Sequence, residues 1–278
     1  MEDSGIPLYT VELATGSQEF SVTDRSDPYN IQLRSDHELW YKENLVNIAL
    51  QRLPRRWDLI AWLDADIAFV RPDWVSAARE KLKQHSFVQM FSHVVDLGPH
   101  FEPLGVRDGF VYRYLTTDEK SREGERNIAA NNIGQTGYAW AARRDVLEAM
   151  GGLIETSILG SNDYFIAQAL VGAVTPEMTR MPGSNYVASI MEWQRRCEKQ
   201  IHGDLGYVNT TIFHYWHGRR KDRGYDDRWR ILVENRFDPL VDLKKNEEGL
   251  LELTNRNAPL REAIRSYFRS RNEDSSEA

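Results

Sequence analysis

Two aspartates, Asp64 and Asp66, follow an apolar run of Leu, Ile, Ala and Trp at residues 59–63. The run has the composition of a buried strand, and the alternation of side chains along a strand places both carboxylates on the same side. Neighbouring carboxylates at such a place are costly unless a cation lies between them, and Mn²⁺ or Mg²⁺ suits carboxylate oxygens. A solvated turn is the alternative, because Asp-x-Asp is a common tripeptide. The carboxyl end of a strand is where open α/β sheets bind ligands, which favours the metal site.

Two histidines, His214 and His217, lie three residues apart after a strand-like segment at 207–213. Imidazoles at this spacing can bind one metal ion from a turn. A basic and aromatic segment follows directly, and arginine can bind phosphate oxygens through two hydrogen bonds. The pattern predicts a diphosphate site beside the metal, with four candidate ligands: Arg219, Arg220, Arg223 and Tyr225.

A third acidic residue, Asp163, lies at the expected start of a helix that runs to residue 170. Two interpretations fit it: a base that removes the proton of an acceptor hydroxyl, or a carboxylate that interacts favourably with the helix dipole. Upstream, Tyr138 and Trp140 offer flat surfaces for a sugar ring, although aromatic residues in a strand more often belong to the core. The sequence therefore contains candidates for metal binding, diphosphate binding and acid–base chemistry.

Strand-like and helical patterns alternate along the chain, which is typical of a layered α/β fold. Ser35 and Glu38 have the spacing of a capping box, which predicts a helix that ends before Pro54. The pattern predicts a single domain over residues 1–245, a helical tail over 246–271 and disorder over 272–278. The expected elements are strands at 8–13, 59–63, 87–91, 137–142 and 207–213, and helices at 72–84, 143–150, 163–170, 185–201, 228–237 and 259–268.

The segment 98–136 mixes glycine, proline, asparagine and charged residues without apolar periodicity. A loop of this length in a compact domain is usually functional or mobile. Two interpretations remain open, a lid that faces the acceptor and a plain surface insertion.

Composition excludes several classes of protein. The 278 residues carry a net charge of −7, which argues against general nucleic-acid binding. The single cysteine, Cys197, excludes an internal disulfide and is expected to be a packing residue. No apolar run approaches the length of a membrane span, so a cytoplasmic protein without such a span is expected.

These motifs together resemble those of metal-dependent glycosyltransferases with the GT-A fold. The chain is similar to bacterial and phage sequences with the pattern Trp-Leu-Asp-Ala-Asp-Ile, and more distantly to the β-1,4-galactosyltransferase family. The resemblance implies a Rossmann-type mixed sheet flanked by helices, a nucleotide-sugar donor (UDP-sugar above all), Mn²⁺, inversion, and a glycan or other hydroxyl acceptor. On the matching motifs, Asp66 and the histidines His214 and His217 would bind the metal, and Asp163 would be the catalytic base. Asn162 stands on the acceptor side, where the family has an acid.

One family feature has no counterpart here. An N-terminal strand of the form Val-x-x-Pro-x-Arg, which holds the nucleotide base in the family, is not found before Leu8. The chain would then be a truncated gene product, or another polypeptide would supply this strand, or the donor pocket would be built differently. A non-catalytic remnant that binds a nucleotide or sugar is a further alternative. An open sheet edge at this place favours a homodimer. A metal-dependent phosphohydrolase is a further alternative, because such enzymes also carry Asp-x-Asp at a strand end.

Overall fold

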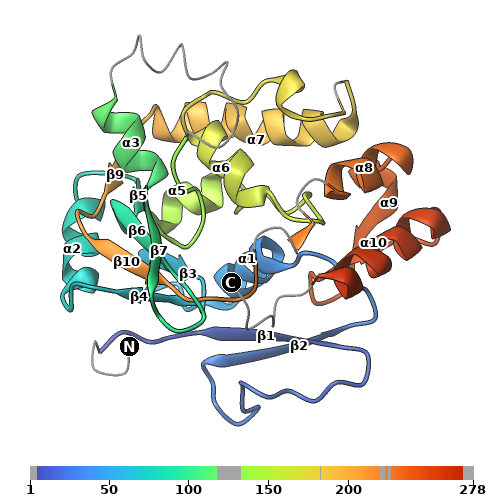
Figure 1. Cartoon of the computed structure of the whole chain (residues 1–278), viewed down its shortest axis with the longest axis horizontal. Helices are drawn as coiled ribbons and strands as arrows, with labels where there is room; N and C mark the ends of the chain where they lie inside the picture. Colours follow the sequence, from blue (N-terminus) through green and yellow to red (C-terminus); the bar gives the residue numbers. More distant parts are fainter. Residues whose placement is uncertain (1–4, 118–132, 182, 220–222, 225–226, 272–278) are drawn as a thin grey trace.

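The computed structural model describes residues 5–117, 133–181, 183–219, 223–224 and 227–271. It confirms the α/β prediction: helices surround several short sheets, and the sheets are mixed rather than parallel throughout (Figure 1). In the described part of the chain, none of the helices combines the length and the apolar character needed to cross a bilayer.

The central sheet contains the strand predicted before Asp64. Its order is β3 (Leu59–Leu63), β8 (Ala139–Arg143), β5 (Phe87–Gln89) and β9 (Leu205–Tyr207). Strand β8 is antiparallel to both β3 and β5, and β5 is parallel to β9. Successive side chains of β3 point to opposite faces of the sheet, so Ile60 is buried while Leu59 is 40% exposed.

A second sheet carries the histidines. Its order is β4 (Ile67–Phe69), β10 (Thr211–His214), β6 (His93–Leu97) and β7 (Pro103–Asp108). Strand β10 lies inside this sheet, antiparallel to β4 and parallel to β6. A small apolar core that includes Phe91, Val94 and Ile212 joins its inner face to the central sheet.

A larger apolar core packs around α1 (Lys42–Arg52), α6 (Asn162–Leu170) and α7 (Asn185–Ile201). Cys197 is buried in this core, as expected of a packing residue. The remaining helical segments before α7 are α2 (Trp74–Leu82), α3 (Phe110–Thr116), α5 (Arg144–Ala149) and the short 3₁₀ helix η3 (Pro176–Met178).

Both ends of the described chain add their own small units. At the N-terminal end, β1 (Thr10–Thr15) and β2 (Asn30–Ser35) form a parallel pair. The C-terminal elements lie to the right of α1 in Figure 1, and Leu251, Leu260 and Ile264 belong to the larger core. These elements are α8 (Asp227–Glu234), α9 (Pro239–Asp242), β11 (Leu243–Lys245), β12 (Leu251–Leu253) and α10 (Ala258–Ser270).

Three local predictions need correction. The segment 98–136 is not a continuous loop, because it contains β7 and α3; residues 118–132 lie outside the described residues. The proposed capping box is wrong, because Ser35 ends β2 and its hydroxyl contacts that of Tyr41, the residue before α1. The tail 246–271 includes the predicted helix but also β12, which pairs with β11. The prediction of disorder over 272–278 also lies outside the described residues.

Candidate metal centre

Three predicted metal ligands, Asp66, His214 and His217, come together. One ligand atom of each lies within 4.8 Å of the others. The Asp66 Oδ2 atom is 3.5 Å from His214 Nε2 and 3.4 Å from His217 Nε2, and the two Nε2 atoms are 3.1 Å apart. The other oxygen, Asp66 Oδ1, is buried and has no hydrogen-bond partner among the described residues. A carboxylate and two imidazoles that converge in this way fit a divalent transition metal.

Strand pairing explains why residues so distant in sequence meet. His214, the last residue of β10, pairs with Ile67 of β4 on one side and with Asp96 of β6 on the other. The next amide, Tyr215 N, donates to Asp66 O at 2.8 Å, so the pairing continues past β4 to the aspartate itself. Strand pairing therefore holds His214 next to Asp66, which lies in the turn just before β4, and His217 follows three residues after β10 ends.

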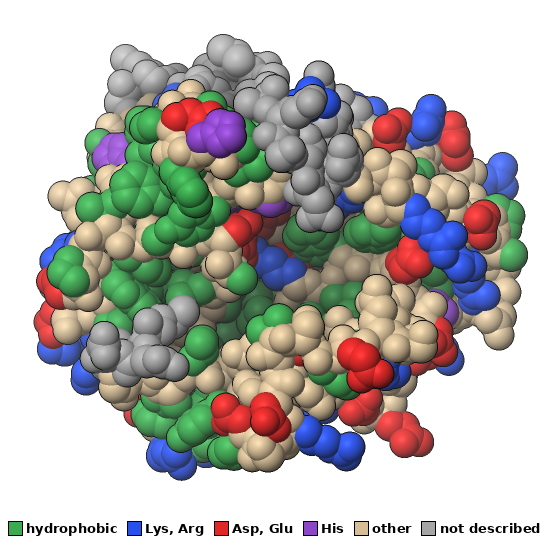
Figure 2. Space-filling model, turned by 60° about the horizontal axis from the view of Figure 1, so that its bottom comes forward, with side chains coloured by type: hydrophobic (Ala, Val, Ile, Leu, Met, Phe, Trp, Pro, Cys, Tyr) green, Lys and Arg blue, Asp and Glu red, His purple; other side chains and the backbone are tan. Residues whose placement is uncertain are grey.

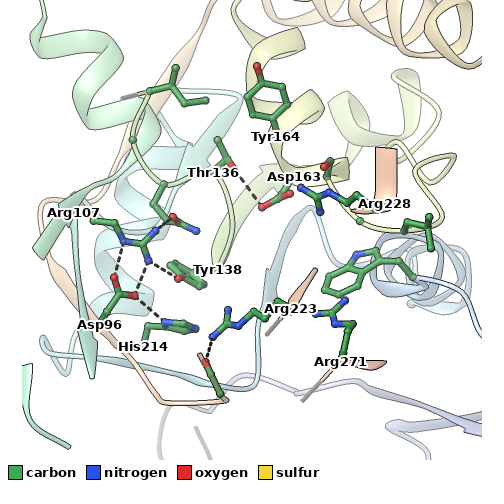
Figure 3. Close-up of a pocket in the computed structure, with 18 of the residues that line it drawn as sticks. Asp96, Arg107, Thr136, Tyr138, Asp163, Tyr164, His214, Arg223, Arg228 and Arg271 are labelled. Carbon is green, nitrogen blue, oxygen red and sulfur yellow. Dashed lines mark hydrogen bonds and ion pairs between the residues drawn. The ribbon is translucent and has the colours of Figure 1, made fainter. Parts of the chain in front are cut away.

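A further carboxylate, Asp96, orients the first histidine. His214 Nδ1 lies 2.9 Å from Asp96 Oδ1, which leaves Nε2 toward Asp66. Arg107 binds Asp96 through two hydrogen bonds of 2.6 Å and also donates to the Tyr138 hydroxyl at 2.9 Å (Figure 3). Metal-binding histidines commonly have the second ring nitrogen held by a carboxylate in this manner. The arrangement supports metal binding independently of the three ligand atoms.

These contacts shift the pKa values of the ligands. Burial alone would lower the pKa of His214, but its contacts with Asp66 and Asp96 raise that pKa above its usual value. For Asp96, burial is outweighed by the bonds from His214 and Arg107, which lower its pKa to about 2. The pKa of Asp66 is lowered as well, because the histidines outweigh its burial. Both carboxylates are therefore ionised at neutral pH: Asp66 faces the two histidines as a candidate metal ligand, and Asp96 is held by Arg107 and His214.

Asp64 does not join this group. Its Oδ1 atom is 2.5 Å from the Lys42 ammonium at the start of α1. Burial raises the pKa of Asp64 even though Lys42 opposes the shift. The side chains at the strand end thus separate into two roles, with Asp66 facing the histidines and Asp64 paired with a lysine.

One of the three candidate ligands, His214, lines a cavity of about 730 Å³, and Asp163 lines the same cavity. The space-filling view shows a hollow in the middle of one face, with basic and acidic side chains inside it (Figure 2). Asp163 lies in the first turn of α6, and its Oδ2 atom accepts a hydrogen bond of 3.2 Å from Thr136 Oγ1. A Cβ atom on Gly137 would lie 3.1 Å from this oxygen, so glycine leaves room for the carboxylate. The described structure therefore places the predicted base and the candidate metal ligand His214 in one cavity.

Backbone conformation in the cavity wall is unusual at two residues. Tyr138 and Ser161 have positive φ angles of 78° and 81°, which are rare for residues with a side chain. Tyr138 precedes β8 and places its ring 4.6 Å from the ring of His214, and Ser161 precedes α6. Strained backbone of this kind concentrates at functional sites.

Two predicted acceptor residues face the protein interior instead. Trp140 is 4% exposed, packs on Phe87 and donates its indole N–H to Thr136 O. Asn162 is 1% exposed, and its amide bonds the Ser157 backbone and the Glu43 carboxylate. Neither lines the cavity, because α6 and β8 turn these positions toward the large core. Their proposed contact with a sugar has no support in this geometry.

The predicted diphosphate residues are placed only in part. Arg223 lines the cavity and donates to Gly218 O at 3.0 Å. Arg219 does not appear among the described lining residues. Arg220 and Tyr225 lie outside the described residues.

Several site residues are absent from the motifs in the sequence. Asp96 follows Val94 and Val95 near the end of β6, the same order of apolar residues before an acid that marks Asp64, so a signal for it exists. Arg107 and Lys42 carry no such signal, because they reach the site through the folding of β7 and α1.

Comparison with known proteins gives no further assignment. No protein-family model and no curated protein matches the chain. Membership of the GT-A glycosyltransferases therefore stays a prediction that rests on the motifs.

Proposed function

We propose that this chain is a metal-dependent glycosyltransferase that moves a sugar from a nucleoside-diphosphate sugar, UDP-sugar above all, to an acceptor hydroxyl. The observation that carries the proposal is a cavity lined by both His214, which belongs to the candidate metal group with Asp66 and His217, and Asp163, an acidic residue at a helix start. The motif resemblance points to the same activity and to inversion.

The roles of the side chains follow from their positions. Asp66, His214 and His217 would hold Mn²⁺ or Mg²⁺, which when bound would neutralise the negative charge of the departing diphosphate. Arg223 reaches the same cavity and offers a guanidinium to phosphate oxygens.

Asp163 is the group suited to proton removal. It takes the proton of the acceptor hydroxyl while the acceptor oxygen bonds to the anomeric carbon, and the bond from that carbon to the diphosphate oxygen breaks. Thr136 holds the Asp163 carboxylate in place through its hydroxyl. The electron pair of the broken bond leaves with the nucleoside diphosphate.

Thermal-shift titration with UDP-sugars and GDP-sugars, with and without Mn²⁺, tests the proposal. A ligand at a hundred times its Kd stabilises the folded state by about 2.7 kcal/mol, which raises Tm by roughly 5 °C in a chain of this size. We expect this rise only with metal and nucleotide together. His217→Gln should abolish it, and His100→Gln, at an exposed site outside the cavity, should not.

Turnover separates the enzyme from a binding protein. Asp163→Asn should keep the thermal shift but lower kcat by about 10² to 10⁴, the usual contribution of a general base. If no nucleotide stabilises the protein in the presence of metal, the proposal fails. Hydrolysis of an aryl phosphate that is lost in Asp64→Asn would instead support the phosphohydrolase alternative.

A further inference from the structure

The cavity extends past Asp163 to a second group of charged and aromatic side chains. Arg228 in α8, Arg271 at the end of α10, and the indole of Trp40 before α1 line this end. In Figure 3, Arg228 and Arg271 lie on the opposite side of Asp163 from Asp96 and Arg107, and Arg228 points toward Asp163. None of these three residues belongs to the metal centre or to the segment predicted to bind diphosphate.

Packing holds this group in a fixed arrangement. The Arg271 guanidinium lies 5.5 Å from the centre of the Trp40 ring. Trp40 donates its indole N–H to the buried Glu43 carboxylate at 3.2 Å, which fixes the edge of the ring. A Cβ atom on Gly160 would lie 3.1 Å from Arg228 Nη1 and 3.7 Å from Trp40, so this glycine lets both side chains approach the α6 start. The result is a preformed wall of two guanidinium groups and one indole.

The position of this wall relative to Asp163 indicates which of the two substrates binds against it. The donor's diphosphate is expected at the metal centre, and a base must face the acceptor hydroxyl that it deprotonates. The space on the far side of Asp163 therefore belongs to the acceptor. Guanidinium groups bind carboxylates and phosphates through charge-assisted hydrogen bonds, whereas a neutral sugar needs neither positive charge.

We propose that the acceptor is an anionic saccharide whose carboxylate or phosphate group is bound by Arg228 and Arg271 beside the Trp40 indole. This inference rests on the proposed function, since it defines the acceptor by its place next to the base. It assigns the chemical class of the acceptor, which neither the motifs nor the metal centre specify.

Binding of small saccharide probes tests the inference without turnover. Methyl β-glucuronide, methyl β-glucoside and glucose 6-phosphate are added to the protein saturated with UDP and Mn²⁺, and ligand-observed NMR gives their affinities. We expect the carboxylate probe, the phosphate probe or both to bind about tenfold more tightly than the neutral glucoside, which corresponds to one charge-assisted hydrogen bond. The two charged probes distinguish a uronic acid from a sugar phosphate.

Matched variants locate the binding to this wall. Arg228→Gln and Arg271→Gln should each weaken the anionic probe about tenfold while UDP affinity stays unchanged. Arg265→Gln, on the same helix α10 but outside the cavity, is the control and should bind as the wild type. Equal affinity for the charged and neutral probes, or an anionic probe that binds both variants normally, overturns the inference. A loss of UDP binding in Arg228→Gln also overturns it, because the arginine would then serve the donor.

These experiments distinguish failure of the glycosyltransferase proposal from failure of the anionic-acceptor proposal. If UDP does not bind but glucuronide does so through Arg228, the glycosyltransferase proposal fails and an anion-binding wall remains. If UDP binds and sugar is transferred only to neutral acceptors, the glycosyltransferase stands and the anionic acceptor is wrong.

Discussion

The ion pair between Lys42 and Asp64 lies in a strongly acidic neighbourhood. Asp66 and Asp163 both disfavour a charge on Asp64, whereas Lys42 forms a hydrogen bond and an ion pair with it. Burial would lower the pKa of Lys42, but Asp64 and its acidic neighbours raise it. The lysine therefore stays charged. Its positive charge offsets the repulsion among the carboxylates of Asp64, Asp66 and Asp163.

Removal of this lysine should destabilise the fold. We expect Lys42→Met to lower the free energy of unfolding by about 2 kcal/mol, less than a fully buried pair because both side chains are about a quarter exposed. Urea unfolding measures the change. The control is Lys83→Met, which breaks an exposed pair with Glu80 and should cost less than about 0.5 kcal/mol. Equal losses in the two variants would contradict the argument.

Glu43 makes the free energy of unfolding depend on pH in the direction opposite to that of a carboxylate whose pKa is lowered by folding. Burial raises the pKa of this 3% exposed side chain to about 7, and Asp163 adds to the shift while Lys42 opposes it. Between the unfolded value of 4.5 and about 7, the folded state binds one proton more than the unfolded state. The stabilisation is therefore present below pH 4.5 and is lost as the pH rises through about 7.

Substitution of Glu43 by glutamine should remove this dependence. The stability of Glu43→Gln relative to the wild type should increase by about 3 kcal/mol between about pH 5 and about pH 8. Urea unfolding across this range gives the difference. Glu80→Gln, at an exposed position, should follow the wild type throughout. A difference between Glu43→Gln and the wild type that does not change with pH would show that the folded-state pKa is not raised.

Strand β10 is the element on which the metal centre depends. Its residues alternate between two environments: Ile212 is fully buried between the sheets, and Phe213 is 37% exposed on the opposite face. His214 points to the same side as Ile212. Packing of Ile212 between the sheets therefore fixes the position of β10, and with it the position of His214 next to Asp66.

A cavity beneath this strand should disturb the metal centre as well as the fold. We expect Ile212→Ala to cost about 3 kcal/mol and to weaken Mn²⁺ binding, because the register that holds His214 relaxes. Phe213→Ala, one residue away, should cost about 1 kcal/mol and leave Mn²⁺ affinity unchanged. Calorimetric titration of Mn²⁺ compares the two variants. Normal metal affinity in a folded Ile212→Ala protein would show that the strand does not position the ligand.

Elements with strong local patterns are the ones that the sequence predicts well. Helix α7 and strand β3 have clear periodicity, and both occur as expected. Strands β6 and β7 are not predicted because Gly98, Pro99 and Pro103 interrupt the apolar pattern of the sequence. These two strands are stabilised by pairing with each other, which the local sequence does not show. The capping box at Ser35 fails for a similar reason, since pairing of β2 with β1 outweighs the local preference for a helix start.

At the scale of the molecule, the site depends on contacts that no local pattern encodes. The residue types at Asp66 and at the two histidines indicate a metal, and the structure brings them together. The support from Asp96 and Arg107 depends on the register between β6, β7 and β10, which is set by tertiary packing. Trp140 and Asn162 show the converse, because suitable residue types in the correct segment face the core.

Charge distribution over the molecule leads to a last prediction. The chain as a whole carries a charge of −7, yet the cavity is lined by Arg107, Arg180, Arg223, Arg228 and Arg271. Net charge repels an anionic nucleotide from a distance, whereas the arginines attract it at contact. Salt screens interactions between exposed charges beyond about 10 Å at 0.1 M. The change of nucleotide affinity with salt concentration therefore shows whether repulsion by the net charge or attraction by the arginines is larger.

We expect the local attraction to exceed the repulsion. The affinity of UDP with Mn²⁺ should fall severalfold as NaCl rises from about 50 mM to about 500 mM, and Arg223→Gln should reduce this dependence because one contact charge is removed. Arg79→Gln, on α2 and outside the cavity, changes the net charge equally and should leave the salt dependence as in the wild type. Calorimetric titration at each salt concentration gives the affinities. An affinity that rises with salt would mean that the overall negative charge governs nucleotide binding and that the arginines of the cavity do not hold the phosphates.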